Sequence, residues 1–253
     1  MPGTVAITMA GLGSRFAKAG YKRPKYEIEV LERPLFDWSM MALEAFREAG
    51  WRFVFAARAE ESAQSFLEAR CRHLGILFGG LVELAAMTDG QATTALYLAE
   101  DEPIERPFLV FNIDTFVRPG RMRPDVISKQ VHGWIPCFPG PGDGWSFVRV
   151  DAEGRASEVR EKERISDHAT VGLYWFSSAG LFRDTYNEYF HGGQGAEKGE
   201  RYIAPMYNHL ISVGLPVTIS QLELEDVGML GTPEQVAAFA QSPPQAALNL
   251  RTP

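Results

Sequence analysis

The chain has 253 residues and a formal net charge of −7, and 45% of its residues are apolar and 23% charged. This length suits one α/β domain or two small ones and allows a sizeable core. The composition is that of a globular protein. The acidic balance argues against nucleic acid or an anionic membrane surface as the main partner.

Cysteine content and hydropathy narrow the class further. Only Cys71 and Cys137 are present, without paired spacing, so we expect neither a disulfide framework nor a structural zinc site. No apolar stretch approaches the roughly 20 residues that span a bilayer. The start "MPGTVAITMAG" lacks the basic region and the apolar length of a signal peptide. We therefore expect no membrane association and a cytoplasmic location.

Strands and helices alternate through the first half of the chain. Apolar runs predict strands over 5–9, 52–58, 81–85 and 108–114, and helical spacing predicts helices over 34–49, 60–73 and 93–100. This order predicts a Rossmann-like α/β fold of three α/β/α layers, in which a mostly parallel central sheet carries helices on both faces.

The second half is more mixed. The turn-rich "PCFPGPGDGW" predicts a hairpin within 135–150, and strands follow over 158–163, 169–176 and 217–224. Helices are predicted over 181–190, 203–213 and 233–240. We expect a single domain over 1–241, with a nucleotide-type half to about 130 and a small acceptor-binding β-region over 131–241. Residues 242–253 are expected to form a flexible tail.

The stretch "TMAGLGSRFAKAGYKRPKYEIEV" (8–30) lies where ligands bind in such sheets, after the first strand. Gly11 and Gly13 permit a tight turn whose N–H groups can face an anion. Arg15 can hold two phosphate oxygens, and Lys25 adds a second cation. This pattern predicts a triphosphate-sized anion site, and the alternative is a glycine turn with two solvated cations. Neither the P-loop nor the dinucleotide fingerprint matches.

"MAGLGSRF…RPK" resembles the signature loop of the nucleotidyltransferase superfamily, which includes sugar-phosphate nucleotidyltransferases and CTP-dependent cytidylyltransferases. The resemblance implies that the loop wraps a nucleoside triphosphate and that Arg15 and Lys25 neutralise its phosphates. The implied nucleotide-binding residues of this loop are Ala10, Gly11, Leu12, Gly13, Ser14, Arg15 and Lys25. With Leu12 in place of a common glycine, the loop is more similar to that of cytidylyltransferases.

Two further segments match the same family in order. "TDGQATTAL" resembles its base-recognition loop, which implies base contacts for Gly90, Gln91 and Thr93; the alternative is a simple helix cap. "FNID" resembles the strand that ends in a metal-binding aspartate. A hard carboxylate facing phosphates suits Mg²⁺, so Asp114 is the expected ligand, and the alternative is a turn residue.

Two late segments complete the resemblance. "VREKERISDHATVGLYWF" is similar to the acceptor-binding segment and implies that role for Glu161, Lys162 and Gly172, with Lys162 meeting the acceptor phosphate. Neighbours on a strand point to opposite faces, so Glu161 and Lys162 share the site only if the backbone is irregular there. The alternative is a charged edge strand.

"DVGMLGTPEQV" resembles the late motif of the family, which often carries a second metal carboxylate two residues before the glycine. Here Asp226 lies five residues before Gly231. We expect Asp226 to join Asp114 as a ligand of Mg²⁺, with Glu225 and Glu223 as rivals.

The resemblance implies an enzyme that transfers a nucleoside monophosphate, CMP from CTP, from a nucleoside triphosphate to a small phosphorylated acceptor such as phosphocholine or phosphoglutamine, in capsule or surface polysaccharide biosynthesis. Three alternatives stay open: a sugar-1-phosphate enzyme using UTP or dTTP, a non-catalytic nucleotide-binding module, and a glycosyltransferase, which would want an Asp-x-Asp motif where "NIDT" offers one carboxylate. No nucleic-acid partner is expected, and a homo-oligomer stays open.

Overall fold

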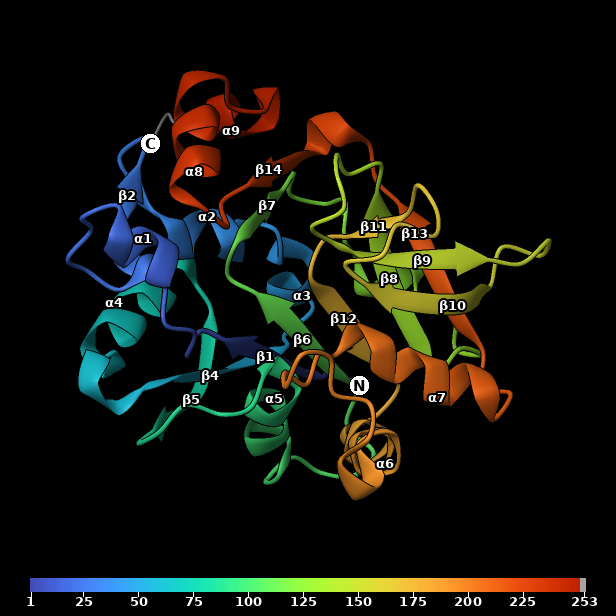
Figure 1. The fold of residues 1–253 in the computed structure, drawn as a ribbon. Helices are drawn as coiled ribbons and strands as arrows, with labels where there is room; N and C mark the ends of the chain where they lie inside the picture. The colour runs from blue at the N-terminus through green and yellow to red at the C-terminus, as the bar shows by residue number, and fades with distance from the viewer. Residues whose placement is uncertain (251–253) are drawn as a thin grey trace.

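A computed structural model describes residues 1–250 (Figure 1). Its centre is a parallel sheet in the order β6-β1-β4-β5. These strands are β1 (Thr4–Thr8), β4 (Arg52–Arg58), β5 (Leu77–Leu84) and β6 (Phe108–Asn112). They carry the apolar runs that predicted them, and β5 begins four residues earlier than expected. The mixed, mostly parallel core confirms the predicted fold class.

The second half of the chain extends this sheet with antiparallel strands. They are β8 (Gly133–Phe138), β9 (Ser146–Val150), β10 (Ala156–Glu161), β11 (Ala169–Thr170) and β12 (Leu173–Phe176). β12 joins the two halves because it pairs with both β6 and β8. The predicted hairpin over 135–150 is wrong, since β11 lies between β8 and β9. β13 (Val217–Gln221) pairs in parallel with β8.

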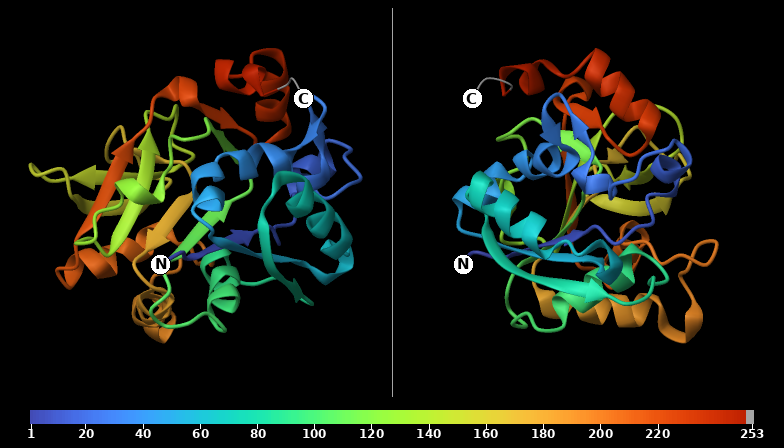
Figure 2. Two further views of the ribbon diagram at one scale, coloured as in Figure 1. Left: turned by 180° about the vertical axis from the view of Figure 1, so that it is seen from behind. Right: turned by 90° about the vertical axis from the view of Figure 1, so that its left-hand side faces the viewer.

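Helices cover both faces of the sheet, as alternating side chains require. On β1, Val5 and Ile7 join the core under α2 (Leu35–Met41), α3 (Glu44–Glu48) and α4 (Gln64–Leu74). Ala6 joins the opposite core, under α5 (Gln91–Ala99), α6 (Ala179–Tyr189) and α7 (Tyr207–Ser212). Figure 2 shows these layers from two further sides. β1, β4 and β6 are therefore buried on both faces, whereas β5, at the edge of the sheet, is only partly buried.

A third apolar cluster packs residues from 16–41 against Phe116 and residues from 230–250. β7 (Thr115–Val117) pairs with β14 (Val227–Met229), next to α8 (Pro233–Gln241), α9 (Gln245–Asn249) and α1 (Ser14–Lys18). Trp38 packs edge-on against Phe116 and Phe239 in this cluster. A short ladder of β2 (Glu29–Val30) and β3 (Arg33–Pro34) leads into α2. The segment that contains β14 and α8 is thereby held beside the opening loop.

Several predicted helices are interrupted. The helix expected over 34–49 divides into α2 and α3, because i→i−3 hydrogen bonds from Ala42 and Leu43 tighten the chain where both side chains are fully buried. Ser62, with φ of 50°, separates a 3₁₀ turn from α4. Within the expected tail, α9 buries Ala247, and residues 251–253 lie outside the described residues. Among residues 1–250, no helix has the length and apolar character that crossing a membrane requires.

Candidate active site

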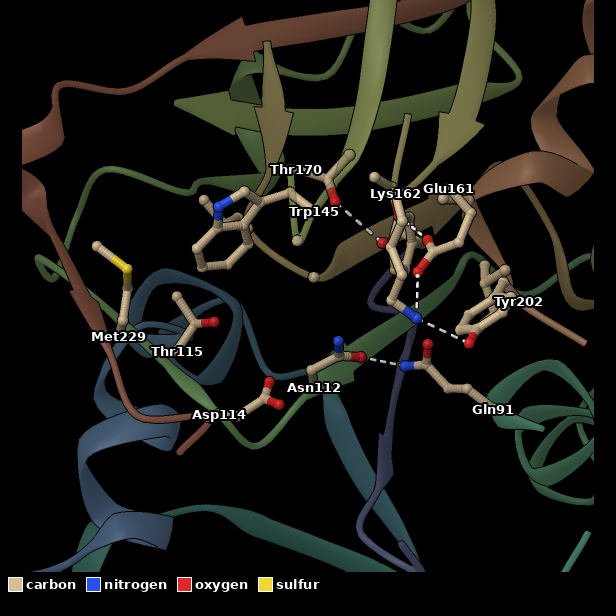
Figure 3. Close-up of a pocket in the computed structure, with 18 of the residues that line it drawn as sticks. Gln91, Asn112, Asp114, Thr115, Trp145, Glu161, Lys162, Thr170, Tyr202 and Met229 are labelled. Carbon is tan, nitrogen blue, oxygen red and sulfur yellow. Dashed lines mark hydrogen bonds and ion pairs between the residues drawn. The ribbon is translucent and has the colours of Figure 1, made fainter. Parts of the chain in front are cut away.

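Two cavities lie side by side at the carboxyl ends of β1 and β6. One, of about 620 Å³, is lined by the opening loop and by 87–91. The other, of about 510 Å³, is lined by β9, β10, β11 and the start of β7 (Figure 3). They share six residues, which are Arg15, Gln91, Asn112, Asp114, Glu200 and Gly231. We name them the loop cavity and the β cavity.

The opening loop forms the wall of the loop cavity. All of its implied binding residues line that cavity: Ala10, Gly11, Leu12, Gly13, Ser14, Arg15 and Lys25. Gly13 has φ of 57°, a left-handed conformation that glycine adopts without strain, and precedes α1. Arg15 is exposed and lines both cavities, so its guanidinium stands where the two meet.

Lys25 and Asp114 face each other across this junction. Lys25 lies in a 3₁₀ turn after Pro24, and its Nζ is 3.3 Å from Asp114 Oδ2. Asp114 lies two residues beyond the end of β6, and its backbone oxygen accepts a hydrogen bond from Leu230 N at 2.8 Å. The Asp114 side chain is 39% exposed, so it remains open to a ligand.

Of the three residues predicted to recognise the base, two line the loop cavity and one lines neither cavity. Gly90 and Gln91 line the loop cavity. A Cβ on Gly90 would lie 2.4 Å from Arg201 O, so the close approach is to the chain's own backbone. Thr93 lines neither cavity: its hydroxyl donates to Asp89 and is 2.7 Å from the Tyr186 hydroxyl. Thr94, one residue on, lines the loop cavity instead.

Glu161 and Lys162 lie together in the β cavity, despite being neighbours in sequence. β10 ends at Glu161, and Lys162 has φ of 52°, which turns its side chain to the same cavity. Lys162 Nζ is 3.2 Å from Glu161 Oε1 and donates to the Tyr202 hydroxyl at 2.9 Å (Figure 3). The left-handed residue is thus the backbone irregularity that a shared site requires.

The surroundings of Lys162 keep it charged. Burial alone lowers the pKa of this ammonium group, but the hydrogen bond to Tyr202 and the charge of Glu161 outweigh it, and the pKa lies above its ordinary value. Glu161 also accepts from Ser146 and is 9% exposed. The β cavity therefore holds a fixed cation, which suits an anionic ligand.

Gly172 positions an amide between the two cavities. It has φ of 81°, and a Cβ there would lie 2.7 Å from Asn112 Nδ2. Asn112 N donates to Gly172 O at 3.0 Å, and Gln91 Nε2 donates to Asn112 Oδ1. Gly172 lines the β cavity, and it allows Asn112 to lie at the junction.

Asp226 requires a correction, because the structure does not bring it beside Asp114. Leu230 is the residue that lies opposite Asp114, and Asp226 lies four residues before Leu230, which is about 13 Å along an extended chain. The Asp226 side chain is 1% exposed and pairs with Arg118 at 2.8 Å and Arg121 at 2.5 Å. Its rivals Glu225 and Glu223 are exposed, and none of the three lines either cavity.

The donor set of the junction fits a metal held mainly by its substrate. Within residues 1–250, no three His, Cys, Asp or Glu side chains gather in a way that could hold a metal ion. The Asp114 carboxylate, the Asn112 amide and the Thr115 hydroxyl line one cavity. Mg²⁺ commonly takes one or two carboxylates and completes its shell with phosphates and water. The residues present suit this arrangement.

Sequence reasoning missed several residues of the site. Trp145, Glu200, Tyr202 and Met229 line the β cavity without having been predicted. Glu200 and Tyr202 follow the turn-rich segment 192–199. Arg201, between them, docks at the start of α5, because its N donates to Asp89 O at 2.8 Å and its O accepts from Ala92 N at 3.0 Å. No local pattern marks them. Asn112 could have been found, because "FNID" already pointed to the end of that strand.

Comparisons with solved structures agree with this geometry. The nucleoside-diphosphate-sugar pyrophosphorylase from Vibrio cholerae RC9 is 34% identical, over 94% of this chain and 100% of that one, with a TM-score of 0.85. The inositol-1-phosphate CTP transferase from T. maritima is 15% identical, over 92% and 90%, with a TM-score of 0.71. A Bacillus anthracis structure named for glucose-1-phosphate thymidylyltransferase is 16% identical, over 96% and 95%, with a TM-score of 0.74. The last two share the fold.

No protein-family model matches the chain, and no curated protein does. The Vibrio relative is nevertheless matched along its whole length, and the ordered motifs of the sequence gather at one junction in the structure. On these grounds the chain belongs to the nucleotidyltransferase superfamily.

Proposed function

We propose that the chain transfers CMP from CTP to a small phosphorylated acceptor, with Mg²⁺, and releases pyrophosphate. One observation carries this proposal: two cavities meet at Arg15 and Asp114, and Lys162 stands in the second one. The loop cavity would take the nucleotide and the β cavity the acceptor. We propose a cytoplasmic enzyme of capsule or surface polysaccharide biosynthesis, with one catalytic domain over 1–241.

In the proposed reaction, a phosphate oxygen of the acceptor attacks the α-phosphorus of the nucleotide in line. The new bond joins that oxygen to the α-phosphorus, and the bond to the bridging oxygen breaks, so pyrophosphate leaves. An acceptor phosphate is already anionic and needs no strong base. Catalysis then consists of positioning and charge stabilisation.

In this proposal, four charged residues in the two cavities each have one of these tasks, positioning a phosphate or stabilising its charge. Arg15 and Lys25 would hold the phosphates that leave, and Lys162 would hold the acceptor phosphate beside the α-phosphorus. A Mg²⁺ ion held by Asp114 would neutralise charge on the nucleotide phosphates. The choice of CTP rests on the similarity of "AGLGSR" to cytidylyltransferase loops.

A second candidate is a sugar-1-phosphate enzyme that uses UTP or dTTP. It is favoured by the name of the Vibrio relative and by the many hydroxyl and amide groups of the β cavity, from Asn112, Thr115, Ser146, Thr170 and Tyr174. A non-catalytic nucleotide-binding module is the third. The binding-module interpretation is disfavoured because the charged residues that the reaction would need all line the two cavities: Arg15, Lys25, Asp114 and Lys162.

The test is pyrophosphate release by the purified protein with Mg²⁺. The four ribonucleoside triphosphates and dTTP would be crossed with phosphorylated choline, amino-acid amides, glycerol and hexoses. Release with CTP and one acceptor is the expected result. Release with UTP or dTTP and a sugar phosphate would establish the second candidate. Nucleotide binding without release for any acceptor would favour the binding module.

A further inference from the structure

Asp114 and Glu200 are the two carboxylates that line both cavities, and the β14 wall beside Asp114 carries no carboxylate. β14 pairs with β7 so that Met229 lies opposite Thr115, the residue after Asp114. Met229 lines the same cavity as Asp114 and stands two residues before Gly231 (Figure 3). A thioether is a soft donor and a poor ligand for a hard cation such as Mg²⁺. This wall therefore offers no anionic ligand.

The other carboxylates near the junction are already engaged. Asp226 is held by Arg118 and Arg121 at the far end of the same ladder. Glu161 is paired with Lys162 and accepts from Ser146, and Glu200 accepts from the Tyr202 hydroxyl. In the loop cavity, Glu61 is paired with Arg58 and Asp89 with Arg201. Asp114 is thus the carboxylate on which a metal at the junction depends.

Asp114 in turn is paired with Lys25, at 3.3 Å. A cation that binds Asp114 must compete with this ammonium group, which is 17% exposed and close by. A triphosphate in the loop cavity offers Lys25 a stronger anionic partner. Nucleotide binding then frees Asp114, and metal binding frees Lys25, so each ligand favours the other by the same factor.

We propose that this chain takes up its divalent cation together with the nucleotide and holds almost none without it, because Met229 replaces a second carboxylate and Lys25 occupies the first. The proposal rests on the proposed function, since it assumes that the loop cavity binds a nucleoside triphosphate. It adds two features particular to this chain: a one-carboxylate metal site, and coupling of metal to nucleotide through the Lys25–Asp114 ion pair.

The test measures binding of Mn²⁺ alone and of CTP with and without Mn²⁺, by calorimetry and by the electron paramagnetic resonance signal of free Mn²⁺. For the wild type we expect no stoichiometric site for Mn²⁺ alone, and CTP binding at least about tenfold tighter when Mn²⁺ is present. Met229→Asp should bind Mn²⁺ alone at least about tenfold more tightly than the wild type. Met229→Leu, the matched control, should bind it as the wild type does.

Two results would overturn the inference. One is tight binding of one Mn²⁺ by the wild type without nucleotide, a measurement that needs no variant to fold. The other is a folded Met229→Asp protein whose Mn²⁺ binding is unchanged. Failure of the assumption that the loop cavity binds a nucleoside triphosphate looks different, because then none binds under any metal condition, whereas Met229→Asp would still gain Mn²⁺ binding. Failure of the proposed transfer reaction is seen separately, in the pyrophosphate-release test.

Discussion

Charged side chains at the junction already hold one another in place without substrate. Lys25 pairs with Asp114, and Lys162 with Glu161 and Tyr202. Such pairs keep flexible side chains near their working positions and reduce the entropy lost on binding. Each lysine is also partly exposed, so a phosphate can reach it.

Lys162→Gln tests the acceptor role at this scale. We expect the KM for the acceptor to rise at least about tenfold, because a charge-assisted bond to phosphate is lost, while the KM for the nucleotide changes little. Steady-state kinetics with both substrates varied would measure this. Lys129→Gln, at an exposed site outside both cavities, is the control. A rise confined to the nucleotide KM would contradict the assignment.

The pH dependence of acceptor binding follows from the raised pKa of Lys162. The ammonium group stays protonated below that pKa, so acceptor binding should persist through neutral pH and weaken only on the alkaline side. Tyr202→Phe removes a hydrogen bond that raises this pKa, so the weakening should begin at lower pH. The measurement is the acceptor KM against pH for both proteins, and identical profiles would argue against a role for Tyr202.

At the scale of elements, the site depends on where strands end. Asp114 follows β6, Lys162 follows β10, and Gly172 precedes β12, so three chain segments outside the regular ladders converge. Regular strands would send neighbouring side chains to opposite faces. The left-handed residues Lys162 and Gly172 break this alternation at the cavity.

Gly172→Ala should therefore harm both stability and binding. The added methyl group meets Asn112 Nδ2 at 2.7 Å and forces a left-handed alanine, so we expect a loss of about 2 kcal/mol in the free energy of unfolding. Gly142→Ala, with φ of 68° and open space, isolates the backbone cost at about 1 kcal/mol. Urea unfolding compares the two, and equal losses would show that Asn112 adapts.

Asp226→Asn tests whether this carboxylate serves the β7–β14 ladder and not a metal. Removing its charge leaves Arg118 and Arg121 without their buried partner, and we expect a loss of about 1–3 kcal/mol in unfolding free energy. The dependence of activity on Mg²⁺ concentration should stay as in the wild type. Glu225→Gln, at the exposed neighbour, should change neither. Unchanged stability with an altered metal dependence would restore Asp226 as a ligand.

For the whole molecule, the segment around Arg33 and Trp38 and the C-terminal segment stabilise each other away from the junction of the two cavities. Arg33 Nη2 donates to Leu250 O at 2.6 Å, and Ala247 is buried in the cluster that contains Trp38 and Phe239. Figure 1 shows α8 and α9 on the far side of the molecule from α6. The segment after α8 thus packs on the fold without lining either cavity.

Truncation after Gln241 should lower stability and spare catalysis. The lost hydrogen bond and packing amount to about 1 kcal/mol, which corresponds to a fall in Tm of about 2–4 °C for a domain of this size. Differential scanning calorimetry measures the fall, and pyrophosphate release at 25 °C should match the full chain. A truncated protein that fails to fold would extend the domain beyond 241.

Local patterns alone determined much of this protein. The apolar runs of β1, β4 and β6, the glycine loop before Arg15, and the carboxylate after β6 are each encoded within a few residues, so they were predictable from the sequence. Their order also predicted the fold class, since parallel strands with intervening helices allow few arrangements.

Only the tertiary structure decided which residues complete the site. Tyr202 reaches Lys162 from forty residues away, Met229 comes to face the junction through the β7–β14 ladder, and Asp226 is taken by two arginines more than a hundred residues earlier. These contacts depend on long-range packing and register, which no short sequence pattern contains. The sequence thus determined the strands and the anion loop, and packing determined the partners of each charge.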